Sequence, residues 1–244
     1  MAGNDSSTPV VLLHGVGLDR TIWAELEGLL DRPVHALDLP GHGEQPPLTS
    51  ETTLAELSQD VLDRLPEGKV HLVGFSLGAL IAMHIAAHHP ERVETLALLS
   101  AVCERTEEEA AAVATRLTAA RQDFAGSMAT ALDRWFPETT ANSAVLREST
   151  RSMLFANDPG SYVRAYEVFA TGDRQIAGDL ALIQAPTLMI TGAEDPGSTP
   201  DMSHRLHDRI QESTVTIIPD ARHMIPVTHP RVLARELTRH FAQG

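Results

Sequence analysis

The feature that most constrains the fold is an alternation of short apolar, β-branched runs with segments of helical periodicity. The apolar runs and the helical patterns between them are Val10–Leu13, Thr21–Leu30, Val34–Leu37, Thr53–Leu65, Val70–Val73, Leu77–His88 and Val93–Leu99. After a gap the alternation resumes with Thr187–Thr191, Asp201–Ile210, Val215–Ile218 and Arg231–Phe241. Apolar strands separated by helices are typical of βαβ units, whose parallel sheet is covered on both faces. We therefore predict an α/β protein with a mostly parallel central sheet flanked by helices.

The strand signal disappears between Glu104 and about Asp179. A capping-box sequence from Thr106 to Glu109 predicts an alanine-rich helix that runs to about Arg121. The further helical patterns are Phe124–Phe136, Ser143–Ala156 and Tyr162–Phe169. A helical insertion that emerges beyond the carboxyl ends of the strands would cover the place where α/β proteins bind ligands. We predict a core domain of residues 1–103 and 180–244 and a helical cap of residues 104–179.

The composition excludes several functional classes. The 244 residues include 19 Lys and Arg against 33 Asp and Glu, a net charge of −14, whereas a nucleic-acid binder needs a basic patch. The single cysteine, Cys103, excludes an intramolecular disulfide framework and a Cys-rich metal site. The first ten residues lack a signal-peptide pattern, and the longest apolar stretches are too short to span a bilayer. We expect a cytoplasmic protein that binds neither nucleic acid nor membrane, with the choice between monomer and homodimer open.

The most specific motif is Gly74-Phe75-Ser76-Leu77-Gly78, which follows one predicted strand and precedes a predicted helix. This strand–turn–helix context is the one in which the pentapeptide forms a nucleophile elbow. The turn strains the serine backbone, so the residues two before and two after it must be very small. We predict that Ser76 is a nucleophile whose hydroxyl projects above the sheet.

A serine hydroxyl needs a general base, and the base needs a carboxylate that orients it. Among the 12 histidines, His223 is best placed, because it follows the Val215–Ile218 strand and precedes the last helix. Asp195 follows the Thr187–Thr191 strand in the same topological position, with Glu194 and Asp220 as rivals. We favour Asp195 because the order serine, acid, histidine is the one that this kind of fold uses.

The tetrahedral intermediate of acyl transfer also needs two N–H donors for its oxyanion. The sequence His14-Gly15-Val16-Gly17 follows the first strand, and its glycines let the backbone approach a substrate closely. We predict that the N–H groups of Val16 and Leu77 form the oxyanion hole.

Taken together, these motifs resemble those of the α/β-hydrolase superfamily, over nearly the whole chain. The segments that carry the resemblance are His14–Gly17, Asp38–Gly43, Gly74–Gly78, Thr191–Asp195 and His223. Within the superfamily the chain resembles small capped esterases and lactonases, particularly 3-oxoadipate enol-lactonases. The points of likeness are Arg134–Phe136, Ala156–Pro159, Tyr162–Phe169 and Ala185–Leu188. Ser76 excludes the branches that attack with aspartate, namely haloalkane dehalogenases and epoxide hydrolases.

Residues of the cap are expected to determine the substrate. The enol-lactonase likeness implies that Arg134 binds a substrate carboxylate through two hydrogen bonds, and a surface arginine is the alternative. Arg147 and Arg151 share a helix face that would suit an acidic carrier protein, as in pimeloyl-carrier methyl-ester esterases, although a solvated face is favoured. The candidates for an apolar pocket wall, with core packing as the alternative for each, are Trp135, Phe136, Met153, Phe155, Tyr166 and Phe169.

Other polar residues are interpreted as structural. His84 and His88 lie one helical turn apart but lack a third zinc ligand, so we expect a polar helix face and no metal site. His42 is expected to order the loop after Val34–Leu37, and Cys103 is expected to be a packed small residue.

We therefore predict a cofactor-free serine hydrolase that cleaves a small carboxylic ester or lactone. Three alternatives remain open: a carbon–carbon bond hydrolase of aromatic-compound breakdown, a carrier-protein methyl-ester esterase, and a ligand-sensing member of the fold without catalysis. One fold hosts many chemistries, so the choice among them depends on the site.

Overall fold

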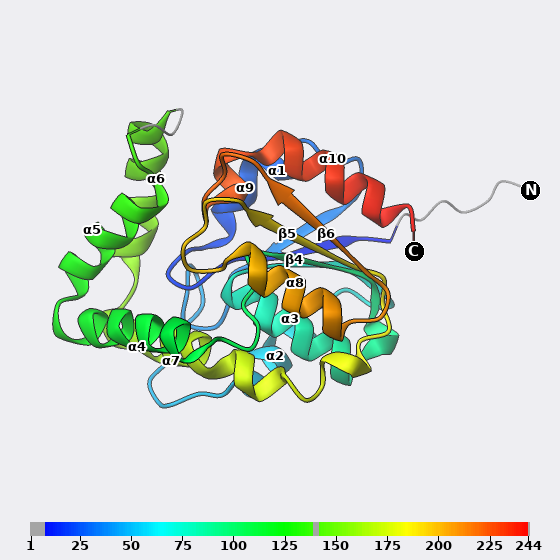
Figure 1. The fold of residues 1–244 in the computed structure, drawn as a ribbon, viewed down its shortest axis with the longest axis horizontal. Helices are drawn as coiled ribbons and strands as arrows, with labels where there is room; N and C mark the ends of the chain where they lie inside the picture. The colour runs from blue at the N-terminus through cyan, green and yellow to red at the C-terminus, as the bar shows by residue number, and fades with distance from the viewer. Residues whose placement is uncertain (1–7, 139–141, 244) are drawn as a thin grey trace, which may run out of the picture.

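The computed structural model describes residues 8–138 and 142–243, which form a six-stranded parallel sheet with helices on both faces (Figure 1). The strands are β1 (Val10–Leu13), β2 (Val34–Leu37), β3 (Val70–Phe75), β4 (Val93–Leu99), β5 (Thr187–Gly192) and β6 (Ser213–Ile218). Their order in the sheet is β2-β1-β3-β4-β5-β6, and every neighbouring pair is parallel. The predicted α/β fold is confirmed.

Two layers of helices cover this sheet (Figure 1). The helices of one face are α1 (Ala24–Glu27) and α10 (Pro230–Phe241), and α9 (Ile225–Thr228) leads into α10. The helices of the other face are α2 (Leu54–Asp63), α3 (Leu77–His88) and α8 (Pro200–Arg209). The short 3-10 turns are η1 (Arg20–Trp23), η2 (Pro90–Arg92) and η3 (Leu180–Leu182). The single helix predicted over Thr21–Leu30 is wrong in detail, because η1 and the short α1 take its place.

Helix α3 is apolar over most of its surface, and ten of its twelve residues are buried. It packs against β3, β4 and α2 on the sheet side and against a long helix of the insertion on the other. A helix that is hydrophobic all round is stable only inside a core, so its first turn is held rigidly. His84 and His88, the two residues that remain partly exposed, form the polar face predicted from the sequence.

In the described residues between β4 and β5 there are four α-helices, and we call Glu107–Ile176 the helical segment. They are α4 (Glu107–Gln122), α5 (Phe124–Trp135), α6 (Ser143–Ala156) and α7 (Pro159–Ile176). The predicted capping box forms, since Glu109 N–H donates to Thr106 Oγ1 and Thr106 N–H donates to the Glu109 carboxylate. Helices α4 to α6 stand beyond the carboxyl ends of the strands, and α7 returns along α3 (Figure 1).

Helix α7 attaches the helical segment to the sheet region. The Arg105 guanidinium, just before α4, donates to the Asp173 carboxylate of α7 at 2.7 Å, and both side chains are almost fully buried. At the other end of α7, the Ser161 hydroxyl donates to the Gly41 carbonyl. The amide of Asn157, between α6 and α7, donates to the carbonyl of Gly17. These contacts place the start of α7 against the loops that follow β1 and β2.

None of the helices in the described part of the chain combines the length and the apolarity that crossing a bilayer requires. Residues 1–7, which carry most of the segment tested above for a signal peptide, lie outside the described residues.

Candidate active site

Ser76 occupies a sharp turn between β3 and α3. Its backbone has φ 56° and ψ −111°, a conformation that non-glycine residues rarely adopt. A Cβ atom on Gly74 would lie 2.3 Å from the Gly78 carbonyl oxygen, and one on Gly78 would lie 2.4 Å from the Leu13 carbonyl oxygen. Both flanking positions therefore require glycine, as the sequence motif predicted. The turn brings the buried Ser76 to the wall of a cavity.

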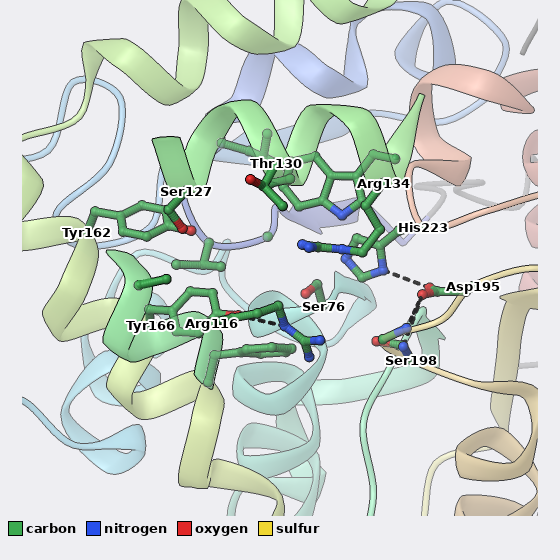
Figure 2. A pocket seen from close by; sticks show the side chains of 18 of the residues that line it. Ser76, Arg116, Ser127, Thr130, Arg134, Tyr162, Tyr166, Asp195, Ser198 and His223 are labelled. Atoms are coloured by element: carbon green, nitrogen blue, oxygen red, sulfur yellow. Dashed lines mark hydrogen bonds and ion pairs between the residues drawn. The ribbon is translucent and has the colours of Figure 1, made fainter. Parts of the chain in front are cut away.

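His223 and Asp195 form a buried pair beside Ser76. The His223 Nδ1–H donates to Asp195 Oδ2 at 2.7 Å, which leaves Nε2 facing the cavity (Figure 2). The other carboxylate oxygen of Asp195 accepts from the N–H groups of Gly197 at 2.9 Å and Ser198 at 3.0 Å. Burial alone would raise the pKa of Asp195, but the charge and hydrogen bond of His223 and these two N–H groups outweigh it, so the pKa lies below its usual value. Asp195 is therefore a carboxylate at neutral pH.

The rival acids have other environments. Glu194 is half exposed and pairs with Arg222 at 3.4 Å, and Asp220 is exposed. Only Asp195, among the three candidate acids, is hydrogen-bonded to His223.

The serine and the imidazole line the same cavity, but no hydrogen bond joins Ser76 Oγ to His223 among the described residues. In free enzymes such bonds are often long and tighten only with substrate. Two aromatic side chains lie beside the His223 ring. The ring centroid of Phe75 is 5.0 Å from that of His223, and Trp135 of α5 stacks on the imidazole at a centroid distance of 5.7 Å and an interplanar angle of 20°. Trp135, expected to be a pocket wall, thus also contacts the imidazole.

The loop after β1 carries the predicted oxyanion donors. Val16 is buried and lines the cavity with Ser76, and Leu77 begins α3 directly after the serine. Neither N–H donates to a protein acceptor in residues 8–138 and 142–243. Unpaired N–H groups at a helix start favour negative charge on a ligand.

Two buried histidines hold this loop in place. The His14 Nδ1–H donates to the Gly15 carbonyl at 2.8 Å, and His14 Nε2 accepts from Leu39 N–H at 2.9 Å. His42 lies against it with ring centroids 5.2 Å apart and bonds the Pro40 carbonyl, which agrees with an ordering role. Burial lowers the pKa of His14 to about 3 and that of His42 to about 4, so both rings are neutral.

The cavity has a volume of about 400 Å³, within the range of small-molecule sites. Its floor comes from the loops after β1, β3, β5 and β6, and its walls come from α4, α5 and α7 of the helical segment (Figure 2). Of the predicted wall residues, Trp135, Tyr166 and Phe169 line it. The prediction was wrong for Phe136, Met153 and Phe155, which do not: Met153 lines a separate small hollow, and Phe155 packs on Phe124 at the surface.

Two arginines enter the cavity, and the sequence predicted only one of them. The predicted Arg134, on α5, is half-buried, and burial followed by the charge of Arg116 lowers its pKa. Arg116, on α4, donates to the Tyr166 hydroxyl at 3.4 Å. Ser127 and Thr130 of α5 add hydroxyl groups to the same wall. Helical spacing alone does not show whether a polar residue faces solvent or a cavity, so nothing in the sequence identified Arg116, Ser127 and Thr130.

Other reactive residues lie elsewhere. Burial raises the pKa of the Cys103 thiol to about 12, which agrees with a packed side chain. No group of three or more potential metal ligands is found in the described part of the chain.

Comparison with known proteins places this arrangement in context. Residues 10–236 match the profile of the Alpha/beta hydrolase family. The (E)-2-((N-methylformamido)methylene)succinate hydrolase of Acinetobacter baylyi is 31% identical over 227 residues, which cover 91% of this chain and 86% of that protein. The pimeloyl-[acyl-carrier protein] methyl ester esterase of Chromobacterium violaceum is 31% identical over 243 residues, 95% of this chain and 93% of that one.

Among solved structures, the enol-lactonase from Burkholderia xenovorans LB400 superimposes with a TM-score of 0.86 at 23% identity. The match covers 96% of this chain and 91% of that one. At this identity the likeness concerns the fold.

Proposed function

This chain belongs to the alpha/beta hydrolase family, as its motifs predicted, and from that premise we propose that it is a serine hydrolase acting on a small carboxylic ester or lactone. One observation carries the proposal: the Asp195–His223 hydrogen bond of 2.7 Å lies in the same cavity as a serine on a strained turn. That combination supplies a nucleophile, a base and an orienting carboxylate.

In the proposed reaction Ser76 Oγ attacks the substrate carbonyl while His223 Nε2 accepts its proton. Asp195 keeps the proton of His223 on Nδ1 and stabilises the imidazolium that forms. The N–H groups of Val16 and Leu77 bind the oxyanion. His223 then protonates the leaving alcohol or enol. Water, activated by the same histidine, releases the acid from the acyl-enzyme.

The helical segment acts as a cap in this proposal, with residues 104–179 forming the cap and residues 1–103 and 180–244 the core. Arg134, Trp135 and Tyr166 contact the substrate, since all three side chains line the cavity from the cap side. The relative from Acinetobacter baylyi hydrolyses a compound named as a succinate, and a substrate with acidic groups would suit a cavity that contains Arg134.

A carrier-protein methyl ester is a second candidate, because one relative of 31% identity is named for that reaction. Docking an acidic carrier would use free surface cations. The predicted cationic face on α6 has little free charge, however: Arg147 pairs with Asp133, and Arg151 contacts Glu148 and the Phe155 ring. We therefore favour a small free ester or lactone.

A phosphonate ester label tests the chemistry directly. We expect one equivalent to attach covalently, with the added mass located by peptide mapping on Ser76, and a His223→Ala variant to react far more slowly. Labelling at another residue, or none under conditions where a known serine esterase is labelled, would overturn the proposal.

A panel of esters and lactones of varied acyl length then defines the reaction. We expect turnover of at least one simple ester or lactone. Turnover of a vinylogous diketone without any ester activity would favour a carbon–carbon bond hydrolase. Tight binding without turnover of any member would favour a ligand sensor.

A further inference from the structure

The cavity contains two positive charges on different helices, and one of them has no place in the reaction described above. Arg116 extends from α4 and Arg134 from α5 (Figure 2). In the close view their guanidinium groups lie on opposite sides of the Ser76 hydroxyl. Both arginines line the cavity that contains Ser76, so a substrate bound to Ser76 shares its cavity with two guanidinium groups.

Neither guanidinium has a carboxylate partner within the described residues. Other arginines of the helical segment do have carboxylate partners, for example Arg121 with Glu167 and Arg147 with Asp133, and the half-buried Arg164 donates to the Leu48 carbonyl instead. The contrast is informative because the chain has 33 acidic residues against 19 basic ones. Partly buried cations are costly without a partner, and burial together with the charge of Arg116 already lowers the pKa of Arg134.

The cavity holds two carboxylates of its own, and both are engaged elsewhere. Asp195 accepts from His223, Gly197 and Ser198. Asp123 caps the start of α5, where its carboxylate accepts from Gly126 N–H at 2.9 Å. The two guanidinium groups are thus left with free N–H donors that face the cavity.

We infer that the substrate carries two carboxylates beside the carbonyl that Ser76 attacks, one for Arg116 and one for Arg134. This inference rests on the proposed function, because it names the substrate class of the same site. A guanidinium fork matches the two oxygens of a carboxylate. A phosphate has a third oxygen, which would face the aromatic part of the cavity wall formed by Trp135, Tyr166 and Phe169. The cavity therefore suits a carboxylate better than a phosphate. The long bond from Arg116 Nε to the Tyr166 hydroxyl orients the fork and leaves its outer nitrogens free.

Binding of inert ligands tests this charge requirement without turnover. Glutarate, its monoamide and its diamide have nearly the same shape and carry two, one and no carboxylates. By titration calorimetry on the wild-type protein we expect each loss of a carboxylate to raise the dissociation constant by about 10- to 100-fold. Equal affinity for the three compounds, or no binding of glutarate, would overturn the inference. Tighter binding of 3-phosphonopropionate than of glutarate would overturn it in favour of phosphate-type groups.

These measurements separate the inference from the proposed function. A protein that prefers glutarate but hydrolyses no ester would refute the hydrolase and keep the dianion site. A protein that hydrolyses esters but binds glutarate, its monoamide and its diamide equally well would refute the dianion site and keep the hydrolase.

Single variants assign the two charges. Arg116→Gln and Arg134→Gln should each remove most of the preference for glutarate over the monoamide, and Arg116→Lys should restore part of it. Arg147→Gln is the matched control, because it removes an arginine of the helical segment outside the cavity and should keep the full preference. Circular dichroism and thermal unfolding check the fold of each variant. Folded Gln variants that bind glutarate as tightly as the wild type would refute the assignment.

Discussion

The two sides of the cavity are built differently. On the sheet side, Ser76, Asp195 and His223 each follow a parallel strand. Every residue of β3 and β5 is buried, whereas β6, which precedes His223, is mostly half-buried. On the helical side, the walls come from α4, α5 and α7. Nine of the 18 residues of α7 are buried, but only a few side chains of α4 and α5 are. The sheet side thus holds the proposed reacting groups at strand ends, whereas the two arginines of the helical side stand on α4 and α5, which are largely exposed.

This difference suits two separate functions, catalysis on the sheet side and substrate selection on the helical side. Catalytic groups must keep their geometry within fractions of an ångström, which rigid loops at strand ends provide. Residues that select the substrate need only reach into the cavity, so a helix can carry them. We expect substitutions on the sheet side to change the rate of the chemical step, and substitutions on the helical side to change stability and selectivity.

The largest effect should come from Ser76→Ala on the sheet side. With no nucleophile, kcat on p-nitrophenyl acetate should fall by about 10⁴- to 10⁶-fold. The buried α3 that follows the turn should keep the fold intact, which circular dichroism would show. A variant that keeps even a tenth of the wild-type rate would remove Ser76 from the mechanism.

The next largest effect concerns the attachment of the helical side. Asp173→Ala leaves the Arg105 charge buried without its partner, so the free energy of unfolding should fall by about 3–5 kcal/mol. Urea unfolding measures this difference. The double variant Arg105→Met with Asp173→Leu replaces the pair by apolar groups and should recover most of the loss. A loss below about 1 kcal/mol for Asp173→Ala would mean that the pair does not attach α7.

A pH effect should arise from the sheet side alone, because residues 107–176 contain no histidine. The pKa values of His14 and His42, about 3 and about 4, lie below the ordinary value of 6.5. Below pH 6.5 the unfolded chain therefore binds protons that the folded chain excludes. As the pH is lowered, the free energy of unfolding falls, until the pH reaches the pKa values of the folded state. Each ring should lower the free energy of unfolding by about 2 kcal/mol between pH 7 and pH 5.

Urea unfolding at the two pH values measures that difference. His14→Asn should reduce it by about 2 kcal/mol, the contribution of that one ring, whatever the variant does to stability at pH 7. Other buried rings such as His71, whose pKa burial lowers to about 4, should keep their contributions. The exposed His35→Asn serves as the control and should leave it unchanged. An equal difference in the His14 variant would show that other groups cause the effect.

The same contrast explains what the sequence predicted. The elbow around Ser76 needs glycine at two fixed positions, so a local sequence motif predicts it. The positions of Asp195 and His223 were predicted from the order of the strands along the chain. Helices α4, α5 and α6 were also predictable, α4 from its capping box and the others from periodicity. The prediction for α7, Tyr162–Phe169, was too short, because the helix runs over Pro159–Ile176. Arg116 was not, because an arginine on an alanine-rich helix has the same sequence pattern whether it faces solvent or a cavity. Only the packing of α4 against α5 and α7 determines which way it points.

The smallest effect should come from Trp135, where the two sides touch. Its indole stacks on the His223 ring at 5.7 Å, and such aromatic pairs contribute about 0.5–1.5 kcal/mol. Trp135→Leu should therefore lower kcat by about 2- to 10-fold. Phe155→Leu is the matched control, since this exposed ring of α6 lies outside the cavity, and it should leave kcat unchanged. A 1,000-fold loss in the Trp135 variant would mean that the helical side helps to hold the reacting groups. An unchanged kcat would mean that Asp195 and the sheet-side loops orient the imidazole by themselves.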